Sequence, residues 1–323
     1  MIHCIFIRTY SIIAAMNASG KLWIILNPSA GKGKAATQIP KIENFLKNRA
    51  ENFELIMTRG PGDAIDIARD LSVSDNDIIV AAGGDGTCNE VVNGLLARGN
   101  SGPPLLGILP IGRGNDFSST PEIPNDCIKA LEVLVKRNVR SLDAGFVKGG
   151  FFTEGRYFIN GVGIGFDTKV GFDAAKMKHI RSGLAYAFGA IINIVRYDPS
   201  PVIQMKYNDD EIVLPLAIIS IMNGRRMGGS FFMGPNALLD DGLLDICAMR
   251  RPAGRLRLIK VVSRYTNGSQ IFCHEALTGK TAHIRLNALE GGLAAHCDGE
   301  TICYDGKELE ISCIPGALRL IGA

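Results

Sequence analysis

The sequence predicts a two-part α/β protein, in which a parallel-sheet domain precedes a mostly antiparallel β-sandwich. Up to about residue 140, short apolar runs alternate with helical patterns, as in right-handed βαβ units. From about Ser141, short β-rich runs separated by Gly, Asp and Pro dominate, and this pattern predicts antiparallel strands. With 323 residues the chain is long enough for two cores. We expect domains at 17–140 and 141–313, and we expect the tail, 314–323, to pack back onto the first.

The composition is that of an ordinary globular protein and excludes several classes. Hydrophobic residues make up 46% and charged residues 21%, and the net charge of +3 is too small to indicate a nucleic acid partner. The eight cysteines lack the spacing of a zinc site and fit the reduced thiols of a cytoplasmic protein. No apolar run is long enough to cross a bilayer. We expect residues 1–16 to be a disordered extension without a function.

The first domain is predicted to alternate four strands with four helices. Each strand is a short apolar run that ends in a polar or glycine-rich turn, as buried parallel strands do. The strands are Leu22–Leu26, Phe53–Met57, Ile78–Ala82 and Leu105–Leu109. The segments between them carry the spacing of amphipathic helices. The helices are Lys34–Arg49, Asp63–Leu71, Thr87–Ala97 and Asp126–Arg137.

The second domain is predicted to be built mainly from short strands. The strands are Tyr157–Asn160, Val202–Tyr207, Ile212–Met222, Leu243–Met249, Thr281–Leu286 and Glu308–Cys313. Two helices are expected to interrupt them, at Ser182–Arg196 and Ala253–Arg264. Strands of this kind, closely spaced and separated by turn residues, are typical of a sandwich.

The loop Gly83-Gly-Asp-Gly-Thr87, between an apolar strand and an amphipathic helix, is the most informative segment of the chain. Gly83 and Gly84 allow the backbone to turn sharply and approach a ligand closely, because no Cβ is in the way. Thr87 is predicted to be the N-cap of the helix, whose free N–H groups would face an anion. The loop therefore predicts a phosphate site with the carboxylate of Asp85 beside it. A plain Gly-Asp-Gly turn before a capped helix is the alternative.

Two further polar loops follow strands of the same sheet, at 27–34 and 112–117. Ligands of parallel sheets bind at the carboxyl ends of the strands, so three such loops on one edge indicate a binding site. The first loop is not a Walker A motif, because Leu26 stands where the leading glycine belongs. It matches G-x-G-x-x-A, but no acidic residue follows Phe53–Met57 to bind a ribose, which disfavours a nicotinamide oxidoreductase. Its small residues and two lysines suit a nucleoside triphosphate better.

The other candidate residues are polar groups at strand ends and turns. Asn115 and Asp116 lie in the third loop, where they can form hydrogen bonds or reach a metal-bound water. In the second domain, Asp240 and Asp241 precede a glycine and a strand, and a carboxylate pair lies in the turn Asp298-Gly-Glu300. The alternatives are a capping turn for the first, a hairpin turn for the second and a solvated pair for the third.

Together these segments resemble the diacylglycerol kinase catalytic-domain family, which includes soluble bacterial lipid kinases and relatives of the sphingosine and ceramide kinases. The resemblance runs from about Lys21 to the C-terminus. The Gly-Gly-Asp-Gly-Thr loop alone is shared with NAD kinases, so the ordered set is what identifies the family. The set comprises Asn27-Pro-Ser-Ala-Gly31, Thr58, Gly60-Pro-Gly-Asp-Ala64, Gly83–Thr87, Asn89-Glu90, Gly112–Phe117, Leu239–Asp245, Asp298-Gly-Glu300 and Pro315–Arg319.

The resemblance implies a fold, a cofactor set and residue roles. The fold would be NAD kinase/diacylglycerol kinase-like. ATP would lie on the first domain with its phosphates among a defined group of residues: Asn27, Ser29, Gly31, Thr58, Gly83, Gly84, Gly86, Thr87 and Asn115. Asp85, Asp116 and Asp241, with Asp240 beside them, would hold a hydrated Mg²⁺, an ion that usually keeps several of its waters. Glu300 would be the general base that deprotonates the substrate hydroxyl. The second domain would bind the acyl chains between its sheets.

We therefore expect an ATP- and Mg²⁺-dependent lipid kinase of phospholipid metabolism, with a diacylglycerol-like or sphingoid-like acceptor. It would be cytoplasmic, peripheral to the membrane where its substrate lies, and a homodimer by the usual preference for symmetric pairs. Two alternatives remain open: an NAD kinase-like enzyme with a soluble substrate, and a catalytically silent lipid-binding protein. The chain lacks the Thr-Pro-Thr-Gly-Ser-Thr segment of NAD kinases, and it retains the acidic set that a silent protein would not need.

The helix predicted at 253–264 is basic and has two interpretations. An apolar stripe repeats every three residues, and three cations gather on another face. The stripe is Leu256, Ile259 and Val262, and the cations are Arg257, Lys260 and Arg264. Such a helix either lies on an anionic leaflet beside a lipid entrance, or packs its stripe on the sandwich and leaves its charges solvated.

Overall fold

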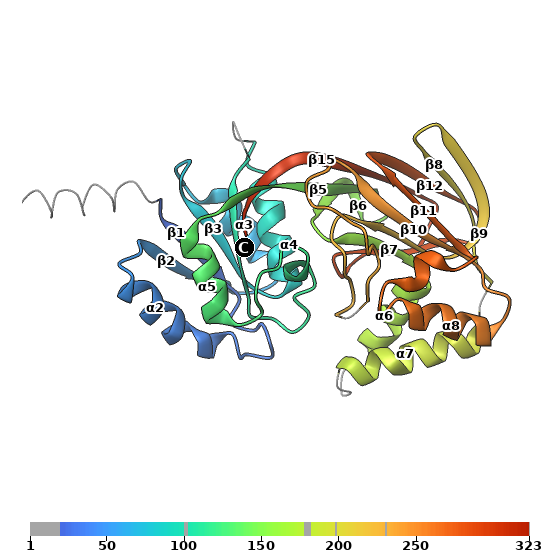
Figure 1. Cartoon of the computed structure of the whole chain (residues 1–323), viewed down its shortest axis with the longest axis horizontal. Coiled ribbons are helices and arrows are strands. Elements are labelled where there is room, and N and C mark those ends of the chain that lie inside the picture. The colour runs from blue at the N-terminus through green and yellow to red at the C-terminus, as the bar shows by residue number, and fades with distance from the viewer. Residues whose placement is uncertain (1–19, 100–102, 178–181, 198, 230, 323) are drawn as a thin grey trace, which may run out of the picture. The chain divides into compact units, whose positions relative to one another are not determined.

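The computed structural model describes residues 20–99, 103–177, 182–197, 199–229 and 231–322 (Figure 1). The expected disordered extension, residues 1–16, lies outside these ranges. The chain divides into two compact units. The first comprises residues up to Leu142 together with Ala317–Ala323, and the second comprises Asp143–Gly316. The chain passes between the units within two strands, β5 (Val139–Gly149) and β15 (Glu308–Ile321).

The first unit contains a parallel sheet with the strand order β2-β1-β3-β4-β15. The bounds are β1 (Leu22–Leu26), β2 (Phe53–Met57), β3 (Ile78–Gly83) and β4 (Leu105–Pro110). All six residues of β3 and of β4 are buried, as apolar runs between neighbouring strands should be. The tail joins this sheet, because Arg319 and Leu320 of β15 pair in parallel with Leu105 and Leu106 of β4. The predicted strands of this unit are confirmed.

Helices connect these strands, and two of them differ from the prediction. The segments are η1 (Ala36–Gln38), α2 (Ile39–Asn48), α3 (Asp63–Asp70), α4 (Asp85–Leu96), η2 (Phe117–Ser119) and α5 (Cys127–Lys136). The helix predicted at 34–49 is split, and α2 begins at Ile39 with Pro40 in its first turn, where a residue without an N–H fits. Thr87 is not an N-cap: Gly84 caps α4 in an extended conformation, and the helix begins two residues before Thr87.

The second unit contains two sheets that share the long strand β9 (Asp210–Met222). One sheet has the order β14-β13-β7-β9-β10-β11, and the other runs β9-β8-β12-β15, with β5 joined to β15 and β6 joined to β5. The new bounds are β6 (Phe152–Phe158), β7 (Gly161–Gly165), β8 (Val202–Tyr207), β10 (Leu244–Arg250), β11 (Ala276–Thr281), β12 (His283–Glu290), β13 (Leu293–Cys297) and β14 (Glu300–Gly306). The pairs within both sheets are antiparallel, apart from the join to β4, so the predicted sandwich is confirmed.

Several local predictions in this unit were wrong. The strand predicted at Thr281–Leu286 is broken at residue 282, because the Thr281 hydroxyl donates to the His283 carbonyl at 2.6 Å and turns the chain. The strand predicted at 157–160 ends at Phe158. The helix α6 (Phe166–Lys176) was not predicted, whereas α7 (Ser182–Arg196) was, and a short η3 (Ser269–Phe272) also appears. The last helix, α8 (Arg255–Arg264), begins two residues later than predicted, after Gly254 with φ 103°.

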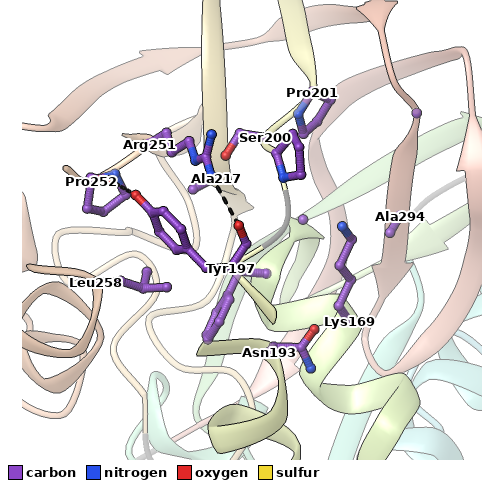
Figure 2. Close-up of a pocket in the computed structure, with 14 residues that line it drawn as sticks. Lys169, Asn193, Tyr197, Ser200, Pro201, Ala217, Arg251, Pro252, Leu258 and Ala294 are labelled. Carbon is purple, nitrogen blue, oxygen red and sulfur yellow. Dashed lines mark hydrogen bonds between the residues drawn. The ribbon is translucent and has the colours of Figure 1, made fainter. Parts of the chain in front are cut away.

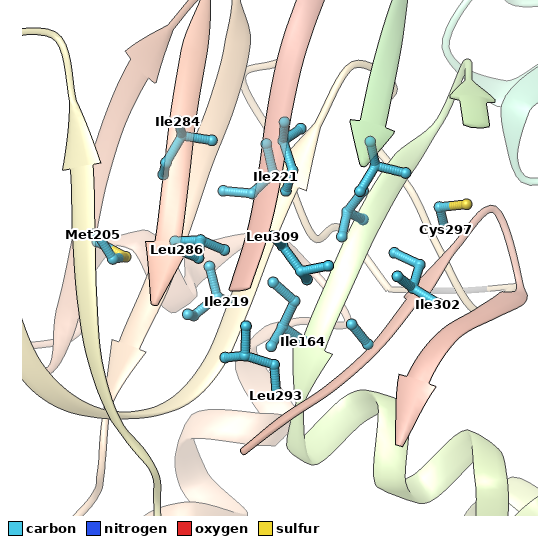
Figure 3. Packing of buried hydrophobic residues seen from close by; sticks show 14 of the residues in the cluster. Ile164, Met205, Ile219, Ile221, Ile284, Leu286, Leu293, Cys297, Ile302 and Leu309 are labelled. Atoms are coloured by element: carbon cyan, nitrogen blue, oxygen red, sulfur yellow. The ribbon is translucent and has the colours of Figure 1, made fainter. Parts of the chain in front are cut away.

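The space between the two sheets of the second unit is filled by apolar side chains (Figure 3). Residues from both sheets meet there with almost no exposure, among them Ile164, Met205, Ile219, Ile284 and Leu286. Fully burying a side chain of this size contributes about 1.5–3 kcal/mol, so this cluster is a principal source of stability. This cluster fills the space between the sheets, and the expectation that acyl chains bind in the second domain stays a prediction.

We expect the N-cap of α5 to make a measurable contribution to stability. The Asp126 carboxylate accepts hydrogen bonds from the N–H groups of Ile128 and Lys129 at 3.1 and 3.0 Å. Asp126→Ala should lower the free energy of unfolding by about 1 kcal/mol, whereas Asp126→Asn, which keeps an acceptor oxygen, should retain most of it. Denaturant unfolding measures both. Equal stability of the alanine variant and the wild type would contradict the capping role.

Candidate functional site

The glycine-rich loop after β3 is shaped by a close contact inside the first turn of α4. A Cβ on Gly83 would lie 2.3 Å from the Thr87 hydroxyl oxygen, so only glycine fits at this position. The Thr87 side chain is buried and accepts a hydrogen bond from Asn27 Nδ2 at 3.1 Å. This bond ties the loop after β1 to the N-terminus of α4. The predicted phosphate loop, 83–87, and the loop at 27–34 are thus joined by a hydrogen bond. Thr87 forms this bond as a residue of the helix and not as its N-cap.

The loop after β4 lies against the same turn. A Cβ on Gly112 would lie 2.3 Å from the Cα of Gly84, so the two backbones are in direct contact. Asn115, with φ 53°, holds the loop in shape: its Oδ1 accepts from the Gly112 N–H at 3.1 Å, and its Nδ2 donates to the Pro110 carbonyl at 3.2 Å. In this structure the Asn115 side chain therefore organises the loop.

Asp85 lies at the centre of these contacts. Its Oδ1 accepts a hydrogen bond from the Phe117 N–H at 3.3 Å. Burial raises the pKa of the Asp85 carboxyl above its ordinary value, and backbone N–H groups of Phe117, Asp116 and Asn115 oppose that rise. A Cβ on Gly114 would lie 2.7 Å from Asp85 Oδ2 and 4.0 Å from Asp116 Oδ2, so both carboxylates flank this glycine. The structure brings the two predicted residues together.

The remaining predicted ligands of the first unit lie at the ends of β1 and β2. The Asn27 Oδ1 accepts from the Ser29 N–H at 3.0 Å, and Gly31, with φ 61°, turns the loop that follows. Lys32 and Lys34 in this loop are exposed. Thr58 is 8% exposed, and its N–H bonds to the Leu26 carbonyl at 2.9 Å. Asn27, Ser29 and Gly31 thus share one loop with two cations that suit a polyphosphate.

Glu90, one of the residues that carry the resemblance, has a structural role. Its two carboxylate oxygens accept from the N–H groups of Gly62 and Ala64 at 3.0 and 3.3 Å. These donors lie at the N-terminus of α3, where unpaired N–H groups need an acceptor. Glu90 on α4 therefore fixes the loop that follows β2, and this accounts for its presence in the motif.

The residues of the first unit fit a divalent cation, although no group of three candidate metal ligands is assembled among the described residues. A small recess there is lined by Gly84, Asp85 and Asn115, with Cys88, Phe117 and others. The Asp85 carboxylate is largely withdrawn from water, and backbone N–H groups rather than a cation surround it in the described part of the chain. Mg²⁺ with its water shell supplies the positive charge that such a carboxylate needs.

The carboxylates after Leu239 lie in the second unit and already have a cationic partner. Lys280 Nζ lies 2.6 Å from Asp241 Oδ2 and 3.3 Å from Asp245 Oδ2. Asp240 is exposed. Asp143, which the sequence did not single out, holds this loop: its two oxygens accept from the Gly242 and Gly316 N–H groups at 2.7 Å each. The sequence signal for Asp143 is weak, since no recognisable motif surrounds this acidic residue in β5.

In the turn Asp298-Gly-Glu300 the two carboxylates have different surroundings. Asp298 is buried and accepts from three successive N–H groups, those of Ile159, Asn160 and Gly161, at 3.0, 3.1 and 2.9 Å. It is a structural residue that holds the start of β7. Glu300 is 35% exposed and pairs with Arg156 Nη2 at 2.8 Å. Of the two, Glu300 is the carboxylate that can reach a substrate, and Arg156 is a partner that the sequence did not reveal.

Two polar features of the second unit were also missed. His296 Nε2 lies 3.7 Å from Asp167 Oδ2, and both Asp167 oxygens are buried with no hydrogen-bond partner among the described residues. A separate cavity lies between α6, the end of α7 and the start of α8, with Lys169 and Arg251 in its wall (Figure 2). Arg251 Nη2 donates to the Tyr197 carbonyl there at 3.1 Å. Asp167 lies two residues after the end of a glycine-rich strand, and this was the available sequence signal.

Comparisons with known proteins agree with the fold and with the family that the sequence resembles. The model of the diacylglycerol kinase catalytic domain matches residues 21–147, and that of the YegS C-terminal NAD kinase beta sandwich-like domain matches residues 160–322. A protein of Chromohalobacter salexigens named "Probable lipid kinase YegS-like" is 30% identical over 72% of this chain and 71% of its own length. The diacylglycerol kinase of Bacillus subtilis is 28% identical over 86% of this chain and 88% of its own.

A crystal structure of a diacylglycerol kinase from Bacillus anthracis has the same fold, with a TM-score of 0.68 at 22% identity, over 94% of this chain and 97% of that one. Within the described residues, no helix is both long and apolar enough to span a bilayer. The two family models together span most of the chain, in the order that its motifs predicted. The protein therefore belongs to the family of lipid kinases that join a diacylglycerol kinase catalytic domain to a YegS-type C-terminal domain.

Proposed function

We propose that this kinase transfers the γ-phosphoryl group of ATP to the hydroxyl of a lipid, with Mg²⁺ bound beside the phosphates. The observation that carries the proposal is Asp85, a largely buried carboxylate enclosed by two glycine loops at the N-terminus of a helix. A helix N-terminus attracts phosphate, and a buried carboxylate beside it needs a cation. ATP with its metal ion supplies both charges.

The residues of the first unit would bind the nucleotide and its ion. The free N–H groups of the first turn of α4, together with Gly83, Gly84 and Gly86, would contact the phosphates at close range. Asn27, Ser29, Gly31 and Thr58 would line the other side, and Asn115 would keep the loop after β4 in place. Asp85 and Asp116 would hold the hydrated ion, with Asp240 and Asp241 as further metal-binding candidates. When bound, Mg²⁺ neutralises charge on the transferred phosphoryl group.

Glu300 would act as the general base of the transfer. It would take the proton of the acceptor hydroxyl as the oxygen–phosphorus bond to the γ-phosphorus forms and the bond to the β,γ-bridging oxygen breaks, which releases ADP. The ion pair with Arg156 would orient the Glu300 carboxylate. Such transfers depend on positioning and charge neutralisation more than on covalent help from the protein.

The acceptor would be a diacylglycerol-like or sphingoid-like lipid at a membrane surface. The relatives named above are lipid kinases, and this favours a lipid acceptor over the soluble dinucleotide of an NAD kinase. A silent lipid-binding protein is disfavoured, because such a protein gains nothing from a carboxylate whose burial is unfavourable.

The acceptor can be identified by incubating the protein with γ-labelled ATP, MgCl₂ and a total bacterial lipid extract, and with NAD in a parallel reaction. We expect label in the lipid fraction, where mass spectrometry then identifies the product. Label on NAD alone would support the NAD kinase-like alternative. Label in neither, in the presence of nucleotide binding, would support the silent protein.

Glu300→Gln should abolish most turnover and leave ATP binding intact. A positioned general base contributes about 10²–10⁴-fold in rate, so kcat should fall by a factor in that range. Glu154→Gln removes an exposed carboxylate from β6, the strand that carries Arg156, and is the matched control; it should retain full activity. If Glu300→Gln kept half of the wild-type kcat, Glu300 would not be the base.

Asp85→Asn and Asp116→Asn should both weaken the dependence of turnover on Mg²⁺, because both carboxylates flank Gly114 and would serve one ion. Residues that act as a unit show non-additive losses, so the double variant should lose little more than the worse single variant. The measurement is kcat/KM over a range of Mg²⁺ concentrations. Losses that multiply in the double variant would show that the two residues do not share an ion.

Asp85→Asn should also stabilise the unliganded protein. Burial raises the pKa of this carboxyl in the folded state, so its charged form at neutral pH opposes folding, and the penalty is relieved as pH falls through the raised pKa. The neutral amide has nearly the same shape. The variant should therefore melt at a higher temperature than the wild type at neutral pH, with a difference that shrinks on acidification. Asp305→Asn, at an exposed site, should show no such gain in melting temperature. A lower melting temperature of Asp85→Asn than of the wild type at neutral pH would contradict the burial penalty.

A further inference from the structure

Exposed apolar side chains are concentrated on three helical segments of the second unit. Of the fourteen exposed large hydrophobic residues among those described, six lie on α7, α8 and η3. They are Phe188, Ile191, Val195, Leu256, Ile259 and Phe272. The three on α7, which are 49%, 55% and 63% exposed, follow one another at spacings of three and four residues and therefore form one stripe along the helix. Side chains of this size, gathered on one surface, indicate an interaction site.

The helix α8 packs on the unit through a stripe other than the predicted one. Leu258 and Val261 are buried, and Tyr265 at the end of the helix is buried with them. Leu256 and Ile259 instead point to solvent with 78% and 45% of their surface exposed. The interpretation in which these two residues pack on the sandwich is therefore wrong. Packing within the second unit does not account for this second, outward-facing apolar stripe.

Cations accompany the exposed stripe of α8. Arg255, Lys260 and Arg264 are exposed, and α8 contains no acidic residue. Arg257 does not belong to this group, because its guanidinium pairs with Glu275 at 2.7 and 2.8 Å and lowers the pKa of that carboxyl to about 2. The predicted cluster of Arg257, Lys260 and Arg264 is thus corrected to one that has Arg255 in place of Arg257.

The two helices present these side chains from neighbouring positions. Arg255 Nε at the start of α8 donates to the Val195 carbonyl near the end of α7 at 3.0 Å, and its guanidinium lies 5.5 Å from the Tyr197 ring. Figure 1 shows α7 and α8 side by side at one edge of the second unit. The described part of α7 also carries no acidic residue; Arg196 at its end is not counted with the cations of this face, because its Nη1 pairs with Asp173 of α6 at 3.2 Å.

We propose that this α7–α8 face, defined by Phe188, Ile191, Val195, Leu256, Ile259, Phe272 and the cations Arg255, Lys260 and Arg264, docks on the surface of an anionic lipid bilayer. Apolar side chains that insert among headgroups, beside cations that meet anionic phosphates, are the two components of interfacial binding. The charge complementarity favours a bilayer over a second copy of this basic face, which would repel itself. The inference rests on the proposed function in one respect, namely that a lipid acceptor resides in a bilayer. Docking itself can be measured without turnover.

The test uses the full chain and sedimentation with vesicles. One set of vesicles is pure phosphatidylcholine, and the other contains phosphatidylglycerol as well. We expect the wild type to prefer the anionic vesicles, and added salt to weaken that preference. Lys260→Gln/Arg264→Gln should reduce the affinity for anionic vesicles by about tenfold or more, since surface cations contribute individually. Leu256→Ser/Ile259→Ser should reduce binding to both kinds of vesicle.

Matched controls remove the same side-chain types from other exposed sites of the second unit. Lys148→Gln/Lys206→Gln removes two exposed cations, and Val213→Ser/Leu289→Ser removes two exposed apolar residues. These controls should bind as the wild type does. Wild-type binding by both α8 variants, or equal losses in the controls, would overturn the proposal. All variants should phosphorylate a detergent-dispersed short-chain diacylglycerol at the wild-type rate, so a failed docking test is distinguishable from a wrong enzymatic activity.

A second measurement does not depend on a loss of binding. Leu256→Trp places an indole on the exposed stripe, and its fluorescence should shift to the blue with anionic vesicles and be quenched by lipids with brominated acyl chains. Leu289→Trp, at an exposed site on β12, should show neither change. If the Leu256→Trp variant sedimented with vesicles while its added indole kept the emission wavelength that it has in water, a different face would dock and the proposal would be wrong.

Discussion

The constraint on which the first unit of the molecule depends is the direct contact between two glycine backbones, at Gly84 and Gly112. A Cβ on Gly112 would lie 2.3 Å from the Gly84 Cα, so the loop after β4 cannot have its conformation unless position 112 lacks a side chain. This contact places the loop after β4 over the first turn of α4, and so it withdraws Asp85 from water. The raised pKa of the Asp85 carboxyl is the electrostatic consequence of that packing.

Other carboxylates of the chain have a structural role, and this role distinguishes them from the residues of the candidate site. Glu90, Asp143 and Asp298 each direct both carboxylate oxygens at backbone N–H groups and thereby hold together segments that are distant in the sequence. Such bonds satisfy buried donors that would otherwise be costly to leave unpaired. Asp85 accepts from Phe117, yet it also lines the recess, and this is the arrangement expected of a residue that awaits a ligand.

Much of this arrangement was predictable from the sequence, and the failures share a cause. The strands β1 to β4 and the loops at their carboxyl ends follow from apolar runs that end in glycine and polar residues, which are local signals. The helix cap was assigned to Thr87 because the side-chain preference at N-caps is local, whereas α4 begins at Asp85, whose carboxylate accepts a hydrogen bond from the distant Phe117 N–H.

Ion pairs between residues distant in the sequence were the features that the sequence predicted least well. Nothing near Glu300 indicates that Arg156 pairs with it, and nothing near Asp241 indicates Lys280, since each pair is formed by segments that meet only in the folded unit. The same holds for α8: its periodicity allowed two apolar stripes, and only the packing of Leu258 and Val261 showed which one faces inward. Sequence patterns thus located the glycine-rich loops at the strand ends, but they did not reveal which charged groups are paired.

The central claim is that the first unit binds ATP through a metal ion organised by Asp85. Calorimetric titration with a non-hydrolysable ATP analogue, with and without Mg²⁺, tests it most directly. The account predicts that Mg²⁺ strengthens binding to the wild type, and that Asp85→Asn binds the analogue with an affinity that hardly depends on Mg²⁺. An equal dependence on Mg²⁺ in the two proteins would contradict it.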